Sequence, residues 1–314
     1  MSWFTVDEEV AGQRLDNFLL RHLKGVPKTH VYRIIRSGEV RLNKGRAAAD
    51  TRVQVGDVVR VPPVRVAQRT PQTAAAPGRE FPLLFEDEYL LAIDKPAGVA
   101  VHGGSGVSFG VIEQLRRARQ YGQPGGARFL ELVHRLDRET SGVLLIAKRR
   151  SALRSLQEQF RARQTGKTYL ALVLGEWPQQ LKVIDQPLRK YLQADGERRV
   201  RPVARDDPDG MHSITLVRVR QRWADCTLLE VTIKTGRTHQ IRVHLASAGH
   251  PIAGDDKYGD FACNKRLHKQ GLKRMFLHAW RLQFTHPVGG EPVQLCAELP
   301  FDLSLPDRFL LPPP

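Results

Sequence analysis

The chain has 314 residues, of which 41% are hydrophobic and 26% are charged, a composition that is typical of a globular protein and excludes a disordered or fibrous one. Its 49 Lys plus Arg against 33 Asp plus Glu give a formal net charge of +16, which favours a polyanionic partner. Because no stretch approaches the roughly 20 consecutive apolar residues of a membrane span, we expect that partner to be a nucleic acid and not a membrane.

The three cysteines, Cys226, Cys263 and Cys296, lie far apart in the sequence and form no CxxC pair. The sequence therefore predicts neither a zinc site nor a disulfide framework, and no metal is expected. Residues 1–20 lack the basic and apolar regions of a secretory signal. We expect a cytoplasmic protein whose thiols stay reduced.

Residues 12–63 are predicted to form a small domain of two helices and a hairpin. Two groups of apolar residues have helical spacing, namely Leu15, Phe18 and Leu19, then Val31, Ile34 and Ile35. Ser37-Gly38 is a helix stop. Alternation of apolar and polar residues over 40–43, a turn at 43–45, and an apolar return over 53–61 through a Gly56-Asp57 turn indicate a small hairpin.

This small domain is more basic than the rest of the chain, since residues 14–69 hold 13 Lys plus Arg against 4 Asp plus Glu. Five of its basic side chains lie beside the apolar stripe of the second helix or at the start of the next strand: Lys28, His30, Arg33, Arg36 and Arg41. A solvated charged face is the alternative interpretation. An excess of one sign on so small a module favours RNA contact, and Lys28, Arg33 and Arg36 are the candidate contacts.

The module resembles the S4 RNA-binding domain in three stretches: residues 14–19 (RLDNFL), 34–40 (IIRSGEV) and 56–59 (GDVV). It departs from many such domains at the start of the second helix, where Pro27-Lys28-Thr29 stands in place of Ser-Arg. The resemblance implies a small α/β domain that binds RNA.

A change of composition at residues 64–80, where Arg, Gln, Thr, Ala and Pro replace the apolar periodicity, predicts a linker. The second domain is expected over residues 81–305, followed by a frayed tail at 306–314. Its strand-like segments are residues 89–94, 129–133, 143–148, 169–174 and 227–234.

Clear helical periodicity occurs at two places in this second domain. Ala152, Leu156 and Phe160 lie on one apolar stripe. A second helix is expected to begin with Thr238 as its N-cap, to carry Ile241 on its apolar face and to end at Gly249. The predicted fold class is therefore α+β, with a small α/β module followed by a large, mainly antiparallel sheet.

A polar loop with the sequence HRLDRETSG, residues 134–142, lies between two of the apolar strands. Asp137 is its informative residue, because Arg135 and Arg138 beside it favour the anionic carboxylate, which suits a nucleophile or a base. From spacing alone, an Asp between two strands is more often a turn or salt-bridge residue. The residues by themselves leave both interpretations open.

The loop resembles the hallmark loop of the RluA-type pseudouridine synthases, in which Arg-Leu-Asp followed by Thr-Ser-Gly carries the catalytic Asp. Three further stretches of that family accompany it in order: residues 94–99 (DKPAGV) with His102, 167–172 (KTYLAL) and 235–244 (TGRTHQIRVH). With the S4-like module, the resemblance covers nearly the whole chain. Short similarities at residues 25–28, 62–66 and 102–106 are closest to the RluC subgroup, which modifies large-subunit ribosomal RNA.

The resemblance implies roles for three residues. Asp137 is the catalytic carboxylate, Tyr169 is the aromatic residue that stacks on the target base, and Arg242 holds Asp137 by a salt bridge. From spacing alone, Tyr169 is a core aromatic residue on a strand and Arg242 is a solvent-facing helix residue. The implied reaction breaks the bond between uracil N1 and ribose, rotates the ring and rejoins it through C5. We expect no cofactor, and the sequence offers no P-loop, no dinucleotide fingerprint and no clustered metal ligands.

A base stacked in RNA is out of reach, so the target uridine is expected to flip into the pocket while Arg135 fills the gap. A simple phosphate contact is the alternative role of Arg135. His134 from the same loop and Ile241 from the helix complete the expected substrate-binding residues. We expect a monomer that acts on large-subunit ribosomal RNA.

Two other classes of function stay open on the sequence. A non-enzymatic RNA-binding or ribosome-assembly factor would use the basic module alone and would tolerate the loss of Asp137. A nucleoside- or glycoside-cleaving enzyme breaks the same type of bond, but it usually needs two placed carboxylates, and Glu139 is the only nearby second candidate. His239 and His244 do not indicate a metal site, because their five-residue spacing puts them off one helical face.

Overall fold

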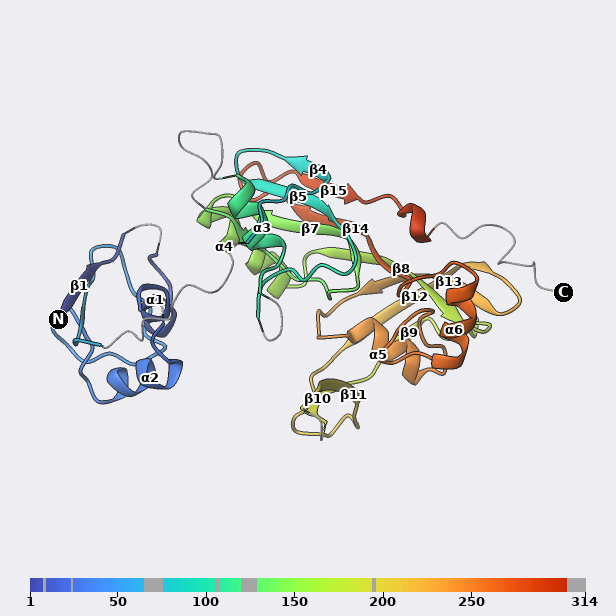
Figure 1. Cartoon of the computed structure of the whole chain (residues 1–314), viewed down its shortest axis with the longest axis horizontal. Coiled ribbons are helices and arrows are strands. Elements are labelled where there is room, and N and C mark those ends of the chain that lie inside the picture. Colours follow the sequence, from blue (N-terminus) through green and yellow to red (C-terminus); the bar gives the residue numbers. More distant parts are fainter. Residues whose placement is uncertain are drawn as a thin grey trace. The chain divides into compact units, whose positions relative to one another are not determined.

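The computed structural model describes residues 1–7, 10–23, 25–64, 76–104, 108–119, 129–193 and 196–303 (Figure 1). Most of the predicted linker at 64–80 and the whole predicted tail at 306–314 lie outside these ranges. The chain divides into two compact units, Met1–Ala75 and Ala76–Pro314. Within the described ranges, no helix is long and apolar enough to cross a membrane.

The N-terminal unit packs two helices, α1 (Leu15–His22) and α2 (Lys28–Arg36), against a small antiparallel sheet. The sheet has the order β1 (Ser2–Thr5), β3 (Val58–Val61), β2 (Arg41–Leu42). The apolar residues that predicted the helices are buried in its core. Helix α2 ends as expected, since Gly38 follows its last turn in the left-handed conformation, with φ of +75°.

Two expectations for this unit need correction. Strand β1 lies before residue 12, where the domain was expected to begin, and Val6 and Val10 join the core. Within the expected return over 53–61, the predicted Gly56-Asp57 turn is present, and the Asp57 carboxylate accepts hydrogen bonds there from the Asn43 side chain and the Gln54 amide. Only the residues after this turn form a named strand, β3.

The C-terminal unit is built on a 10-stranded sheet of described residues. Its main path runs β4 (Leu83–Glu86), β5 (Leu90–Lys95), β7 (Ser141–Ala147), β14 (Leu277–Thr285), β8 (Gly166–Leu174), β13 (Cys226–Ile233), β12 (Ile214–Arg222) and β9 (Val183–Asp185). Strand β15 (Pro292–Cys296) pairs with β14, and β6 (Glu131–Leu132) pairs with β7. Among the described pairings only β7 with β14 is parallel, which agrees with the predicted mainly antiparallel sheet. A separate hairpin joins β10 (Leu188–Leu192) to β11 (Arg198–Pro202).

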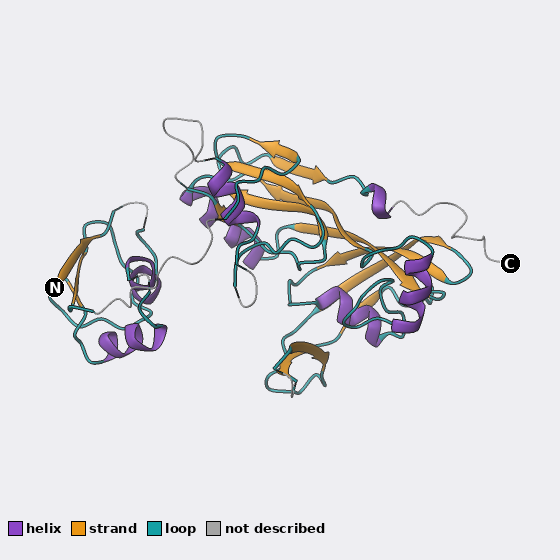
Figure 2. Ribbon diagram, in the orientation of Figure 1, coloured by secondary structure: helices purple, strands orange, loops and turns teal. Residues whose placement is uncertain are grey.

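Helices cover both faces of this sheet (Figure 2). On one face, α3 (Val111–Ala118) and α5 (Gln240–Ser247) share a core with Leu144 and Ile146 of β7. On the other face, α4 (Arg150–Arg161) packs against the alternate residues of β7, and α6 (Phe261–Lys269) lies near the far end. Strand β7 is therefore apolar throughout, as a strand covered on both sides must be. A short 3-10 helix, Phe301–Leu303, closes the described chain.

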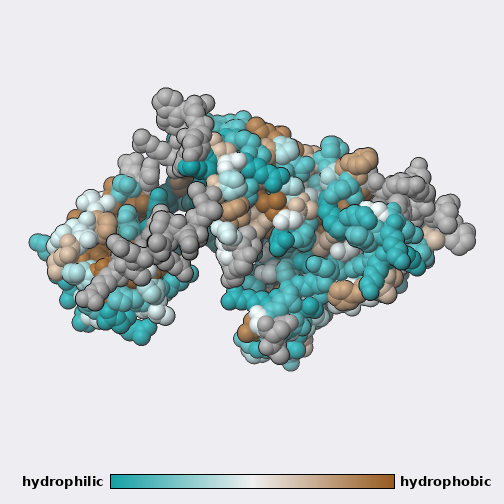
Figure 3. All heavy atoms as spheres, in the orientation of Figure 1, coloured by the Kyte–Doolittle hydropathy of each residue, from teal (hydrophilic) through white to brown (hydrophobic). Residues whose placement is uncertain are grey.

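The sequence expectations for this unit were right for most of the central strands and for α4, and wrong at several edges. The strand expected over 129–133 is only β6. Helix α5 begins at Gln240 with His239 as N-cap, so Thr238 is not the cap. Helices α3 and α6 were not predicted. Helix α6 buries none of its side chains, whereas α3 has a buried apolar stripe of Val111, Ile112 and Leu115 that the prediction overlooked. The visible surface in Figure 3 is mostly hydrophilic, with apolar side chains in scattered areas.

Gly142 fixes the end of the polar loop that precedes β7. Its φ of +109° is a conformation that favours glycine, and a Cβ atom there would overlap the backbone of Ala279 on the parallel neighbour β14. The close approach of these two strands therefore requires the glycine that ends the HRLDRETSG loop, and it sets where Asp137 lies relative to the sheet.

Candidate active site

A cavity of about 280 Å³ opens on the face of the sheet that carries α5. It is lined by the loop before β7, by β8 and by the turn that leads into α5. Six of the residues predicted from the sequence line it together: His134, Arg135, Asp137, Tyr169, Ile241 and Arg242. The other three, Lys28, Arg33 and Arg36, are exposed on α2 of the N-terminal unit.

Asp137 presents its carboxylate to this cavity with its side chain 20% exposed. Its Oδ2 atom lies 3.7 Å from Arg242 Nη1 and 4.0 Å from His239 Nε2. Both distances exceed a hydrogen bond, so the Arg242 guanidinium attracts the carboxylate without using up its acceptor capacity, and His239 leaves that capacity free as well. The Asp137 carboxylate is thus oriented by the charge of Arg242, and its oxygens remain free to contact a ligand.

Arg242 is buried, and Asp255 holds it in place. Its Nε and Nη2 atoms each donate to the Asp255 carboxylate at 2.7 Å, a bidentate pair that leaves Nη1 facing Asp137. Burial acts to raise the pKa of Asp255, but the hydrogen bonds and charge of Arg242, together with hydrogen bonds from the Tyr258 and Lys257 amides, hold the pKa below its usual value. Sequence reasoning missed Asp255, since its only signal was an acidic turn between two glycines, 13 residues after Arg242.

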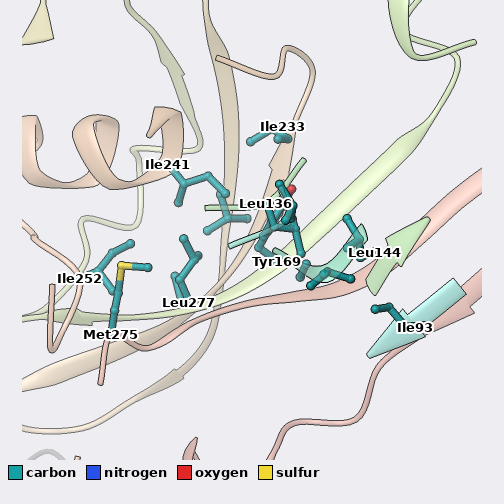
Figure 4. Packing of buried hydrophobic residues seen from close by; sticks show 14 of the residues in the cluster. Ile93, Leu136, Leu144, Tyr169, Ile233, Ile241, Ile252, Met275 and Leu277 are labelled. Carbon is teal, nitrogen blue, oxygen red and sulfur yellow. The ribbon is translucent and has the colours of Figure 1, made fainter. Parts of the chain in front are cut away.

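Tyr169 supplies a flat apolar surface beside the carboxylate. It lies on β8 between β13 and β14, and its ring packs among Leu136, Ile233, Ile241 and Leu277 (Figure 4). Burial, and secondarily the charge of Asp137, raise the pKa of the Tyr169 phenol, so it stays neutral at physiological pH. Such a ring could stack on a base without competing with Asp137 for protons.

Arg135 extends from the same loop and is exposed. Within the part of the chain that the structure describes, its guanidinium makes no hydrogen bond or ion pair. An exposed cation at the edge of the cavity is free to enter or contact a nucleic acid.

Lys95 is a second residue whose importance the sequence did not reveal, although the DKPAGV stretch around it was singled out. It is fully buried, and its ammonium donates to the backbone carbonyls of Pro96, Val99 and Arg138 at 2.8, 2.9 and 3.1 Å. Lys95 therefore ties the end of β5 to the loop that carries Asp137. Burial lowers the pKa of Lys95 to about 7.

His134 is packed into the wall of the cavity. Its ring stacks on Phe160 with centroids 5.1 Å apart, and its Nε2 atom accepts a hydrogen bond from the Leu145 amide at 3.1 Å. Burial, with a smaller contribution from Lys167, lowers the pKa of His134 to about 4. The ring is therefore neutral at physiological pH, as its acceptor role requires.

This depressed pKa predicts an acid-dependent loss of stability. The unfolded chain takes up a proton near pH 6.5, whereas the folded ring stays neutral down to about pH 4, so the unfolded state binds more protons in this window. The contribution of His134 to the free energy of unfolding should then decrease by about 1.4 kcal/mol for each pH unit below 6.5. Denaturant unfolding of the wild type and His134→Gln between pH 7 and pH 4 measures this difference, and parallel pH dependences would contradict the assignment.

Within the described residues, no group of three or more His, Cys, Asp or Glu side chains is placed to hold a metal ion. His244 is directed away from the cavity, where its ring atoms bond to the Thr215 hydroxyl and the Gln186 carbonyl. His239 and His244 therefore do not form a pair.

The chain is similar to two described families, RNA pseudouridylate synthase over residues 89–247 and the S4 domain over residues 13–59. The Haemophilus influenzae protein named ribosomal large subunit pseudouridine synthase C is 51% identical over 300 residues, which cover 94% of this chain and 90% of that protein. The Escherichia coli protein of the same name is 51% identical over 308 residues, covering 96% and 92%. The solved structure of human RNA pseudouridylate synthase domain containing 4 matches 71% of this chain and 90% of its own, with 28% identity and a TM-score of 0.58.

Proposed function

This chain belongs to the RNA pseudouridylate synthase family, and on that premise we propose that it converts specific uridines of large-subunit ribosomal RNA to pseudouridine, with Asp137 as the essential carboxylate. The predicted order of an S4 domain followed by a pseudouridine synthase domain is confirmed, and the chain is an isomerase. The choice of large-subunit RNA comes from the names of its relatives. A cytoplasmic location and a monomeric state are part of the proposal.

The observation that carries the proposal is the grouping of a carboxylate, an aromatic face and a fixed cation in one cavity. The reaction must break the bond between N1 and C1′, hold the detached uracil while it rotates, and form a bond between C5 and C1′. Asp137 can attack C1′, attack the ring or remove a ribose proton, and each route needs the carboxylate at the same place. Tyr169 offers a stacking surface, and Arg242 orients the anion. Holding both partners in this way supplies the proximity that the rejoining step needs.

The target uridine must leave the RNA stack to reach Asp137, because the carboxylate lies inside the cavity. We propose that the uridine is flipped and that Arg135 enters the space it leaves. The exposure of Arg135 and the lack of a partner for its guanidinium in the described ranges support this role. His134 and Ile241 contribute walls of the cavity, and the contact of His134 with Phe160 keeps its ring in place.

The N-terminal unit is proposed to supply affinity through the basic face of α2. Replacing Lys28, Arg33 and Arg36 with Gln should weaken RNA binding and reduce the slope of log affinity against log salt by about 2 to 3, since each lost phosphate contact removes roughly 0.7 to 0.9. Thr29→Ala, an exposed neutral change on the same helix, should leave both quantities unchanged. Filter-binding titrations at several salt concentrations provide the measurement. Deletion of residues 1–75 should have the larger effect and retain slow turnover at high enzyme concentration, and binding that is unaffected by either change would refute the role.

The nature of the product tests the proposed reaction. Purified protein is incubated with unmodified large-subunit ribosomal RNA transcript, and the RNA is digested to nucleosides and separated by chromatography. The expected product is pseudouridine, with no free uracil and no abasic site. Free uracil would indicate a hydrolase and would overturn the proposal. A small-subunit transcript serves as the substrate control and should remain unmodified.

A further inference from the structure

His239 faces Asp137 from the turn that begins α5, and the reaction outlined above assigns it no role. Its backbone has φ of 52° and ψ of 22°, a left-handed conformation that is uncommon for a residue other than glycine. Its side chain is 17% exposed and lines the cavity, and its Nε2 atom lies 4.0 Å from Asp137 Oδ2. Strained backbone of this kind persists only where the surroundings hold it, and it is concentrated at functional sites.

Two hydrogen bonds of the Tyr258 hydroxyl favour one of the two possible positions for the ring proton of His239. The Tyr258 hydroxyl lies 2.8 Å from His239 Nδ1, and the Val200 amide donates to the same hydroxyl at 3.0 Å. Because the hydroxyl oxygen accepts from Val200, its own proton is available to His239. Among the described residues no other hydrogen-bond acceptor is paired with this hydroxyl, so the arrangement that uses its proton has Tyr258 donating and His239 Nδ1 accepting.

The charge of the ring follows from its surroundings. Burial lowers the pKa of His239, while Asp137 acts in the opposite direction, and Arg242 and Lys257 add to the lowering with Asp255 opposing them. The ring is therefore neutral at physiological pH and carries a single N–H. With Nδ1 occupied as an acceptor, that N–H lies on Nε2, on the side of Asp137.

We propose that His239 contacts the substrate, with its Nε2–H donating a hydrogen bond to an oxygen of the target uridine held against Asp137. The 4.0 Å gap to Oδ2 is too long for a hydrogen bond, so Asp137 does not satisfy this donor. A uracil carbonyl and a ribose hydroxyl both offer the acceptor that is needed. Tyr258 acts through His239 as a positioning residue. This inference rests on the proposed function, because it assumes that a uridine occupies the cavity.

The packing of Tyr258 explains why its hydroxyl is held in one place. Its ring lies against Leu188, Val200 and Val243, and the Arg242 guanidinium lies over the ring at 5.2 Å. Tyr258→Phe should keep these contacts and remove only the hydroxyl. Through the Val200 amide, the β10–β11 hairpin thereby influences which ring nitrogen of His239 carries the proton.

Two substitutions of His239 separate a donor role from a backbone role. The amide nitrogen of Gln reaches the position of Nε2, whereas that of Asn reaches only the position of Nδ1, and Asn tolerates the left-handed backbone better. We expect His239→Gln to keep single-turnover pseudouridine formation within about threefold of the wild type and His239→Asn to slow it about tenfold, the effect of one hydrogen bond. The dissociation constant for RNA should stay unchanged in both. Equal losses, or an Asn variant faster than the Gln variant, would overturn the proposal.

Tyr258→Phe keeps the proposal testable if a His239 variant folds poorly. It should slow turnover by a few fold without changing RNA affinity, and a wild-type rate would contradict the role of the hydroxyl. A transcript with 2′-deoxyuridine at the target identifies the acceptor. If His239 donates to the 2′-hydroxyl, the effects of the deoxy substrate and His239→Asn will not multiply, and if it donates to uracil they will. Turnover by the wild type tests the proposed function separately from these variants.

Discussion

Replacing Asp137 with Asn is expected to abolish pseudouridine formation while leaving RNA affinity unchanged. Asn has the shape of Asp but carries no charge and can act neither as a nucleophile nor as a base, so the rate should decrease by about 10³-fold or more. Forming the bond between C5 and C1′ displaces the hydrogen on C5. Release of tritium into water from a transcript labelled at C5 of uridine therefore measures the reaction under single-turnover conditions.

Asp256→Asn is the matched control for this experiment. Asp256 carries the same group, its side chain is 83% exposed, and one of its oxygens lies 3.7 Å from the same arginine, Arg242. Its charge is screened by water, so the variant should turn over at close to the wild-type rate. An Asp137→Asn enzyme that keeps more than a tenth of the wild-type rate would remove Asp137 from the chemistry.

Replacing Asp255 with Ala is expected to have the largest effect on stability. The variant leaves the buried Arg242 guanidinium without its bidentate partner, and breaking a buried ion pair in this way costs about 3–5 kcal/mol. Turnover should also decrease, because Arg242 is no longer fixed beside Asp137. Denaturant unfolding followed by tryptophan fluorescence reports mainly on the C-terminal unit, since it holds Trp177, Trp223 and Trp280. The fourth tryptophan, Trp3, lies in the N-terminal unit and is replaced by Phe in every protein compared in this experiment.

Two further variants show whether the loss of stability in Asp255→Ala comes from the unpaired charge of Arg242. Asp256→Ala removes a neighbouring exposed carboxylate and should change the free energy of unfolding by no more than about 0.5 kcal/mol. Arg242→Met in the Asp255→Ala background removes the unpaired charge, and it should restore part of the stability but none of the activity. A wild-type free energy of unfolding for Asp255→Ala would show that the pair does not anchor Arg242.

Local patterns in the sequence were sufficient for the framework of the fold. The spacing of Leu15, Phe18 and Leu19 and that of Ile34 and Ile35 predicted two helices that the structure contains, because in both the apolar stripe is the buried stripe. Strand β7 is buried on both faces, so its sequence is a continuous apolar run, and that run predicted the strand. Strand β1 was not predicted, because a four-residue edge strand carries little pattern. Helix α3 was overlooked although Val111, Ile112 and Leu115 form a buried apolar stripe.

The candidate site needed information of another kind. Resemblance to a family brought Asp137, Tyr169 and Arg242 together, and their roles stay predictions that the variants above test. From spacing alone, Arg242 was expected to face solvent. The structure buries it, and the Asp255 carboxylate, which lies outside the helix of Arg242, neutralises its charge. Lys95 and Tyr258 act through contacts of the same long-range kind, with Arg138 and Val200 as their partners. No periodicity within one segment encodes such pairs.

The most direct test of the whole account is to map pseudouridines on unmodified large-subunit ribosomal RNA transcript after incubation with the wild-type protein or with Asp137→Asn. Carbodiimide labelling followed by primer extension marks each modified position with a stop. The account predicts discrete new stops with the wild type and none with the variant, although both proteins bind the transcript equally well. If neither protein produces a stop despite tight binding, the conclusion that this cavity isomerises large-subunit uridines is contradicted, and a role in ribosome assembly becomes the better explanation.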